Sequence, residues 1–281
     1  MENTDQNLAL IQTLLSTADL ASELHLLQER SSQVNDAVVE SLILLAQHSS
    51  EQGELESAIQ LADIAINASS ILNDSRLLAD AQFIKAVILQ YGGHLDNAGI
   101  YYQRASDLYE KLDAKSSLAN CLGNLGLLAH DLGNASQAIE YHCASLAITR
   151  QIGNIGAQLA DLTNLAAVYY SQGDYIQAKK RYEEVQALAV ESIEREAEMD
   201  ALSGLGLIYR AQGNLEESRD HFECALVIAR EIHNQRGEAS QLGNLGLVHQ
   251  DMGDFDRALE LQMDTLLTMT SGSTIRGLCA S

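Results

Sequence analysis

The sequence predicts an all-α fold, a solenoid built of antiparallel helix pairs. Three observations predict it: landmark residues recur every forty residues, each period holds two amphipathic stripes of helical spacing, and the chain contains no proline. Self-similarity at a period between about twenty and about fifty residues is typical of stacked repeat architectures. Because proline interrupts helices, its absence fits a chain of uninterrupted helices.

The clearest landmark is a glycine that returns at the same place in every period. It occupies positions Gly53, Gly93, Gly133, Gly173, Gly213 and Gly253. An alanine follows five residues later in most copies, for example at Ala138, whereas Ser218 stands there in one copy. Glycine readily adopts the left-handed backbone conformation that ends many helices. We therefore expect each glycine to separate the two helices of a pair.

Within one period, the small and apolar residues follow helical spacing. In the first half they are Leu122, Leu125, Gly126 and Ala129, and in the second half Ala138, Ile139, His142, Ser145 and Leu146. Such a series lines one stripe of an amphipathic helix. Polar residues at the expected helix starts predict N-caps: Asp74, Asn154 and Asn234 between pairs, and Asn134, Asp174 and Asn214 within pairs.

These residues carry a resemblance to a known family. The clearest copy has Leu202, Leu205, Gly206, Tyr209, Gly213, Phe222 and Ala225. This pattern resembles the tetratricopeptide repeat, whose motif runs W-x-x-L-G-x-x-Y, a turn Gly, A-x-x-x-F and a late Pro. No copy here has the leading Trp or the late Pro, and the period is six longer than the usual thirty-four. Copies of forty residues are similar to those of G-protein-signalling modulator scaffolds and bacterial signalling proteins.

The resemblance covers roughly residues 34–270, as six repeats of period forty. Residues 1–33 are predicted to form a degraded N-terminal capping pair, with helices over Asn7 to Thr13 and Ala18 to Gln28. Residues 271–281 are expected to be a disordered tail. Leu266, Leu267 and Met269 would then be left exposed on the last helix. Three alternatives would account for them: the tail folds back over them, another protein covers them, or the chain is one part of a longer one. We favour the second and third alternatives.

Composition limits the class of partner. With 17 basic and 39 acidic residues the formal charge is −22, which argues against nucleic acid or an anionic membrane as a partner and favours a polar or basic protein. The four cysteines show no metal-ligand spacing, so no metal, cofactor or disulfide framework is expected. No basic leader or long apolar segment is present in the sequence, and we expect a cytoplasmic protein.

The sequence contains no phosphate-binding, nucleophile-elbow or zinc-hydrolase motif, so we expect no enzyme. We expect a non-catalytic scaffold that binds a peptide or helix in its concave groove. The alternative is the sensory or oligomerisation segment of a larger signalling protein, with self-association through the last helix pair. A helical enzyme cup is the least favoured alternative, and the step from repeat to scaffold rests on analogy.

The resemblance implies a right-handed superhelical solenoid in which the first helix of each pair lines the concave surface. Asn124, Asn164 and Asn244 would then present one repeated amide to a peptide backbone, as an asparagine does in similar repeats. The alternative is that these asparagines are repeat consensus, with amides that are solvated or bonded to the next helix. The spacing leaves both interpretations open.

The expected groove differs along its length. Its N-terminal half is apolar: Phe83, Ile84 and Tyr91 share a face with Asp80 and Val87, and the preceding copy adds Ile43 and Leu44. This half would bind an apolar anchor of the ligand near Phe83 and Ile84. The alternative is that Ile43, Phe83 and Ile84 pack against the degraded first pair. The C-terminal half is polar, with Asp131, Tyr170, Arg210 and Asp251. Because the acidic residues are opposed chiefly by one arginine, we expect this groove to reject a terminal carboxylate.

Overall fold

The computed structural model describes residues 2–15 and 20–278, and throughout this part of the chain the regular structure is helical. The helices are α1 (Glu2–Leu15), α2 (Leu20–Glu29), η1 (Ser31–Gln33), α3 (Asp36–Glu51), α4 (Leu55–Leu72), α5 (Ser75–Tyr91), α6 (Leu95–Lys111), α7 (Lys115–Asp131), α8 (Ala135–Ile152), α9 (Ile155–Ser171), α10 (Tyr175–Ser192), α11 (Arg195–Ala211), α12 (Leu215–Glu231), α13 (Gln235–Asp251) and α14 (Phe255–Leu278). The predicted all-α class is confirmed.

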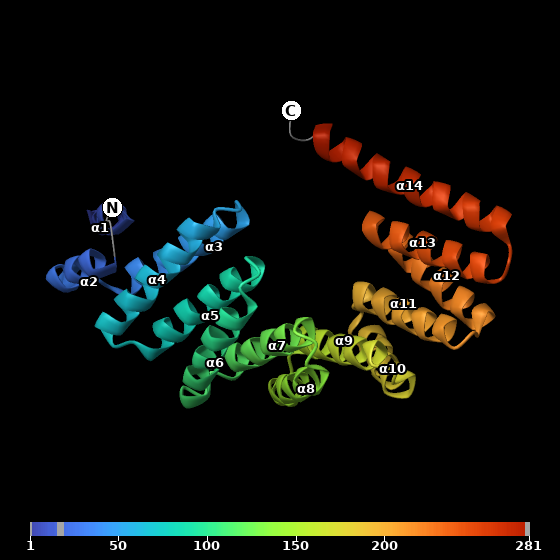
Figure 1. The fold of residues 1–281 in the computed structure, drawn as a ribbon, viewed down its shortest axis with the longest axis horizontal. Coiled ribbons are helices and arrows are strands. Elements are labelled where there is room, and N and C mark those ends of the chain that lie inside the picture. The colour runs from blue at the N-terminus through green and yellow to red at the C-terminus, as the bar shows by residue number, and fades with distance from the viewer. Residues whose placement is uncertain (1, 16–19, 279–281) are drawn as a thin grey trace. The chain divides into compact units, whose positions relative to one another are not determined.

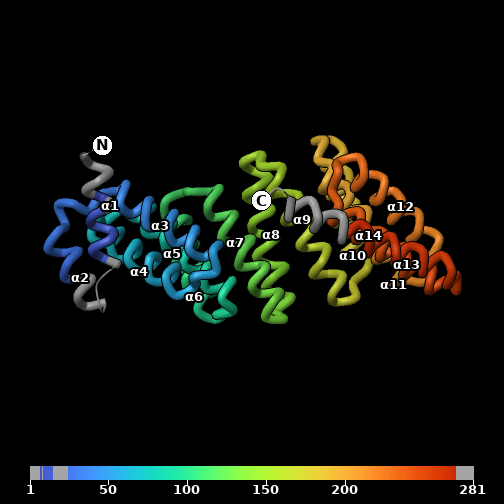
Figure 2. The backbone as a smooth tube through the Cα atoms, turned by 90° about the horizontal axis from the view of Figure 1, so that it is seen from above, coloured from blue at the N-terminus to red at the C-terminus, as the bar shows by residue number. Residues whose placement is uncertain are grey.

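The chain divides into two compact units, residues 1–152 and residues 153–281. In unit 1, every helix from α3 to α7 packs against the next helix along the chain, and α3 also packs against α5 (Figure 1). In unit 2, every helix from α9 to α13 packs against the next, and α9 also packs against α11 (Figure 2). Each unit is therefore a stack of helix pairs in which contacts are made between near neighbours in sequence.

The turn glycines have the backbone conformation that the sequence predicts. Gly53, Gly93, Gly133, Gly173, Gly213 and Gly253 have φ between 76° and 83°. At this φ a residue with a Cβ is strained, so glycine is the residue that fits. N-capping by Asp74, Asn154, Asp174 and Asn234 is confirmed, since each side chain accepts a hydrogen bond from the first turn of its helix. The cap predicted at Asn214 is wrong, because that side chain makes no such bond.

A second left-handed position recurs in the turn that joins one pair to the next. Asn73, Asp113, Gly153, Ile193 and His233 all have φ between 50° and 70°. A β-branched residue is the least suited to this conformation, because its side chain crowds the backbone. Ile193 nevertheless has φ 62° and an exposed fraction of 81%, so little burial offsets the strain.

Replacing Ile193 with glycine should therefore raise the free energy of unfolding by about 1 kcal/mol. Urea denaturation followed by circular dichroism measures the change. The reciprocal control is Gly153→Ala, which places a Cβ at φ 70° and should lower the free energy of unfolding by a similar amount. An Ile193→Gly protein no more stable than wild type would show that the left-handed isoleucine is not strained.

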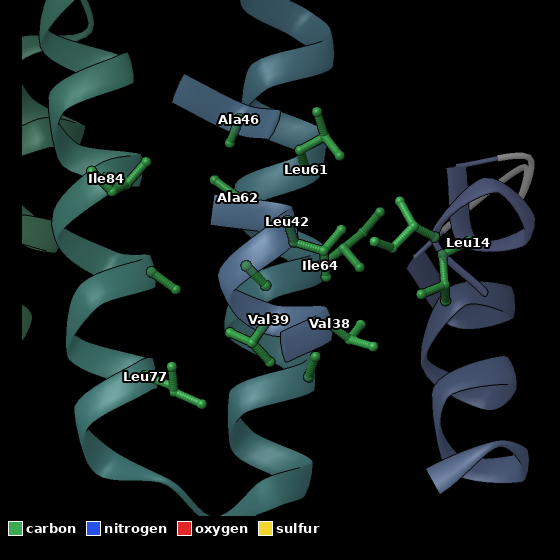
Figure 3. Close-up of a cluster of buried hydrophobic side chains, with 14 of the residues drawn as sticks. Leu14, Val38, Val39, Leu42, Ala46, Leu61, Ala62, Ile64, Leu77 and Ile84 are labelled. Carbon is green, nitrogen blue, oxygen red and sulfur yellow. The ribbon is translucent and has the colours of Figure 1, made fainter. Parts of the chain in front are cut away.

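The core of unit 1 begins at the N-terminal helices. Leu14 of α1 points towards Val38 and Leu42 of α3 and Ile64 of α4, and Leu77 of α5 closes the other side (Figure 3). Ile43 and Phe83 pack against this same cluster while remaining partly exposed. The residues expected to form a capping pair thus supply helices α1 and α2, although Ala18 lies outside the described residues.

Close approaches between helices occur where the sequence places glycine on the buried stripe. A Cβ built on Gly206 would lie 2.8 Å from the ring of Phe222, and one on Gly126 would lie 2.6 Å from the ring of His142. Both rings belong to the second helix of the same pair. The absence of a side chain is therefore what lets these two helices meet.

The C-terminal end differs from the expectation of a tail from residue 271. Helix α14 continues through Leu278, and residues 279–281 lie outside the described part. The segment Thr270 to Thr274 is poor in helix-favouring residues, but it contains no proline, so nothing in it forbids helical backbone. Leu266, Leu267 and Met269 are exposed on this helix, as predicted.

Candidate functional site

A pocket of about 450 Å³ opens on the face of unit 1 that the first helices α3, α5 and α7 form. Its floor is apolar and its rim is polar. The lining residues are Glu40, Ile43 and Leu44 of α3, Asp80, Phe83 and Ile84 of α5, Tyr109 of α6, and Ser117 and Asn120 of α7. Pockets that bind ligands typically have about 300–1,000 Å³ and a mostly apolar lining with a few polar groups.

A second pocket, of about 620 Å³, continues from the first along the same two helices. Ile84 lines both pockets, so they are neighbours on one surface. The second pocket is lined by Gln47, Ser50 and Glu51 of α3 and by Ile84, Val87, Ile88 and Tyr91 of α5. We call the combined surface the α3–α5 trough, defined by Glu40, Ile43, Leu44, Gln47, Ser50, Glu51, Asp80, Phe83, Ile84, Val87, Ile88 and Tyr91.

One end of the trough carries a charged cluster. The guanidinium of Arg76 lies 3.4 Å from the carboxylate of Glu40 and 3.3 Å from that of Asp80. The hydroxyl of Tyr109 donates a hydrogen bond to Asp80 at 2.8 Å. Burial raises the pKa of Tyr109, and the hydrogen bond to Asp80 raises it further. With two carboxylates and one guanidinium, the cluster remains net negative at neutral pH.

Buried contacts with α4 and α6, the second helices of their pairs, hold the apolar floor residues of α5 in place. The ring of Phe83 meets the ring of Tyr102 edge-on, with centroids 5.7 Å apart, and Tyr102 is fully buried on α6. Lys85 of α5 forms an ion pair with Asp63 of α4 and donates to the hydroxyl of Tyr101 at 2.9 Å. Burial lowers the pKa of Lys85, but these two partners outweigh it and raise the pKa overall. Helix α5 is thus fixed against both α4 and α6.

Three predicted site residues lie in this trough. Phe83, Ile84 and Tyr91 line it, with Phe83 half-buried, Ile84 buried and Tyr91 exposed. Phe83 and Ile84 also belong to the core cluster of unit 1, in which α5 packs chiefly against α3, α4 and α6. Their inner sides therefore pack within the stacked pairs, and their outer sides form the floor.

The predicted asparagines are not equivalent. Asn124 donates its amide to the carbonyl oxygen of Asn120 at 2.8 Å. Its own oxygen lies 3.5 Å from the hydroxyl of Tyr102, whose proton is donated to Gln90 at 2.8 Å. One donor of the Asn124 amide is therefore used inside unit 1. Asn164 and Asn244 are half-buried on α9 and α13 of unit 2. That the three amides act as one peptide-binding series stays a prediction.

The polar residues predicted for the C-terminal half meet in unit 2, except Asp131. A pocket of about 210 Å³ is lined by Tyr170, Leu207, Arg210, Ala211 and Asp251. Arg210 donates from Nε to Asp251 at 2.6 Å, so its charge is already paired. Asp131 is the last residue of α7 in unit 1, where it is exposed.

Sequence reasoning placed Ile43 and Leu44 on the same face as Phe83 and Ile84, but it missed Glu40 as the counterpart of Asp80. Glu40 and Asp80, Ile43 and Phe83, and Leu44 and Ile84 stand forty residues apart and meet in one pocket. The period itself carried this signal, since residues one period apart occupy equivalent places on successive helices. Tyr109, on a second helix, and Ser117 had no such signal.

Within the described residues, no group of three or more His, Cys, Asp or Glu is arranged to hold a metal ion. Across the same residues, every helix is too short or too polar to cross a membrane.

Comparison with known proteins identifies the repeat. The tetratricopeptide repeat model matches residues 77–151, 158–225 and 197–266, which together make up more than half of the chain. No curated protein matches the chain in sequence.

Several solved structures share the fold. A signal transduction ATPase with numerous domains (STAND) that has a tetratricopeptide repeat sensor, from Pyrococcus horikoshii, aligns with 17% identity and a TM-score of 0.74, covering 90% of this chain and 40% of that one. The quorum sensor NprR from B. thuringiensis aligns with 13% identity and a TM-score of 0.63, covering 94% and 75%. A tetratricopeptide repeat protein from Parabacteroides merdae aligns with 19% identity and a TM-score of 0.61, covering 82% and 79%.

This chain therefore spans less than half the length of the STAND protein. At these identities the likeness shows the fold alone. The fold is typical of protein-interaction scaffolds. From the family match and the stacked helix pairs, we conclude that this chain belongs to the tetratricopeptide repeat family.

Proposed function

We propose that this chain is a non-catalytic protein-interaction module whose unit 1 binds a segment of a partner protein in the α3–α5 trough. The observation that carries the proposal is the apolar floor, which Ile43, Leu44, Phe83 and Ile84 form on the face of the first helices. Apolar floors with polar rims are the usual form of protein and peptide binding sites.

The exposure of individual side chains supports this proposal. Leu44 is 65% exposed and Tyr91 is 84% exposed, although neighbouring positions on the same helices are buried. Both line one trough, so the exposed apolar area is contiguous rather than scattered. Contiguous exposed apolar area marks interaction surfaces, whereas single exposed residues are common on any protein.

Charge decides which partners fit. The formal charge of −22 repels nucleic acid and anionic membranes, and the trough itself has acidic residues at its rim. A polar or basic protein segment with an apolar anchor is the partner that this surface suits.

Site-specific photo-crosslinking tests the proposal. A benzoylphenylalanine placed at Leu44 should crosslink a partner in lysate of the source cells, and mass spectrometry identifies the crosslinked peptide. The matched control is the same probe at Ile100, an aliphatic residue of unit 1 that is 51% exposed on second helix α6. Equal capture at both positions, or no capture at Leu44, would show that the trough is not the binding surface.

A second candidate function is the sensory segment of a larger signalling protein. It is favoured by two structures of the same fold, one described as a tetratricopeptide repeat sensor and the other as a quorum sensor. In that case the trough would bind the signal or the effector domain. Self-association through the last helix pair stays a prediction.

A further inference from the structure

We infer that the occupant of the α3–α5 trough is a short amphipathic α-helix with basic residues at both ends, lying along α3 and α5. This inference rests on the proposed function and adds the conformation, direction and charge of the ligand. It differs from an extended peptide that crosses successive repeats past the asparagines.

The direction of the trough follows from the register of its lining. On α3 the lining residues run from Glu40 to Glu51, and on α5 from Asp80 to Tyr91. Arg76 bonds to both Glu40 and Asp80, so these two ends lie side by side. The trough therefore runs parallel to the two helices. Eleven residues at about 1.5 Å each give a length of roughly 16 Å, which is about three helical turns.

The chemistry of the floor selects a helix over an extended chain. Ile43, Leu44, Phe83, Ile84 and Val87 offer no side-chain hydrogen-bond donor or acceptor, and the backbone groups of α3 and α5 are used inside those helices. Gln47, Ser50 and Tyr91 carry the uncharged polar side-chain groups of the trough, and these are too few to pair every amide and carbonyl group of an extended peptide. Backbone groups buried without partners are costly. A helix satisfies its own backbone and presents one apolar stripe to the groove.

The rim selects the charge of that helix. Glu40 and Asp80 stand at one end with Arg76 between them, and Glu51 stands at the other end. Both ends are thus net negative, and a ligand with a Lys or Arg near each end complements them.

A second copy of this chain offers α14 as another occupant, because Leu259 and Met263 are exposed on it. Its described surface also carries Asp256, Glu260 and Asp264 against one cation, Arg257. Acidic residues facing an acidic rim repel, so charge disfavours α14 and favours a basic partner helix.

A designed peptide tests the inference on the whole chain. The probe is an acetylated, amidated and fluorescein-labelled peptide with two lysines eleven residues apart, leucines three, four and seven residues after the first lysine, and alanine or glutamine elsewhere. We expect it to bind in fluorescence anisotropy, with helicity that rises on binding. Exchange of both lysines for glutamate, or of one central alanine for proline, should weaken binding at least about tenfold.

Variants of the chain locate the site. Leu44→Asp should weaken binding of the probe at least about tenfold, whereas Ile100→Asp should leave it within about twofold. Both side chains are more than half exposed, so both variants should keep the wild-type circular dichroism and melting curve. Equal affinity for the proline peptide, no effect of Leu44→Asp, or no binding of the probe would overturn the inference.

The crosslinking experiment separates the two levels. A partner captured at Leu44 together with a probe that does not bind would overturn the helical basic ligand and leave the proposed function standing. No capture at Leu44 would overturn both. If the wild-type chain sediments as a dimer and the Leu44→Asp variant as a monomer, a second copy of the chain occupies the trough. That result would overturn the basic helical ligand.

Discussion

Raising the pH from about 9 to about 11 should lower the free energy of unfolding of this chain by several kcal/mol. Burial raises the pKa of the Cys121 thiol to about 12 and the pKa of the Tyr182 hydroxyl to about 12. In the unfolded chain these groups ionise near their ordinary pKa values, about 8.5 for cysteine and about 10 for tyrosine. Between the two values the unfolded chain has released protons that the folded chain retains, so stability falls as pH rises.

Three further groups act in the same direction. Burial raises the pKa of Tyr102, and burial together with the bond to Asp80 raises that of Tyr109. The pKa of Lys85 is also raised, by its bonds to Asp63 and Tyr101 against the opposing effect of burial. The stabilisation that Lys85 contributes is fully present below its pKa in the unfolded chain, and it is lost as the pH rises through its pKa in the folded chain. For each group, the free energy of unfolding falls by about 1.4 kcal/mol for every pH unit between its unfolded and folded pKa values.

Urea denaturation followed by circular dichroism, at pH values from about 8 to about 11, measures this dependence. The Tyr182→Phe variant lacks one titrating hydroxyl, so its stability should fall less steeply above pH of about 10, by up to about 1.4 kcal/mol per pH unit. A stability that stays constant up to pH of about 11 would contradict the prediction.

Replacing Phe222 by alanine should lower the free energy of unfolding by about 3–5 kcal/mol. Phe222 is fully buried in unit 2, in a cluster with Leu226, Leu242 and Leu245. The backbone beside its ring cannot easily move into the space, because the Ser218 hydroxyl of α12 donates to the Gly206 carbonyl of α11 at 2.8 Å. A cavity that does not collapse costs more than the lost transfer energy alone.

Urea denaturation gives the size of this change, and hydrogen exchange shows whether protection is lost over α11, α12 and α13. Phe255→Ala is the matched control, since Phe255 is 68% exposed at the start of α14 and should change stability by no more than about 0.5 kcal/mol. If the two variants were equally stable, Phe222 would not be the anchor of this cluster.

The fold could be predicted from the sequence because its determinants are local and repeat. The turn that ends each first helix has a left-handed residue, which glycine adopts without strain at Gly133 and its counterparts. Capping by Asp74 or Asn154 likewise depends on the next three residues alone. The cap at Asn214 and the end of α14 were not predictable in this way. Both depend on small differences between competing local conformations, which spacing does not report.

Part of the lining of the pockets could be predicted from the sequence, but the shape of the trough could not. Phe83 and Ile84 line one pocket and Arg210 and Asp251 another, because helical spacing decides which face a residue occupies. That these residues bind a ligand stays a prediction. The trough depends on how two such faces align, and spacing within one helix carries no information about that. The internal bond of Asn124 to Asn120 was likewise invisible, because repeat consensus and ligand contact predict the same residue there.

In unit 1, helices α5, α6 and α7 make their main contacts with helices one or two places away along the chain. A duplication or deletion of one whole forty-residue pair beyond α8 would leave α3, α5, α6 and α7, the helices that line the two pockets, as they are. Gene rearrangement could therefore change the length of such an array while the specificity of the trough is inherited unchanged, and point substitutions in the trough could alter specificity while length is kept.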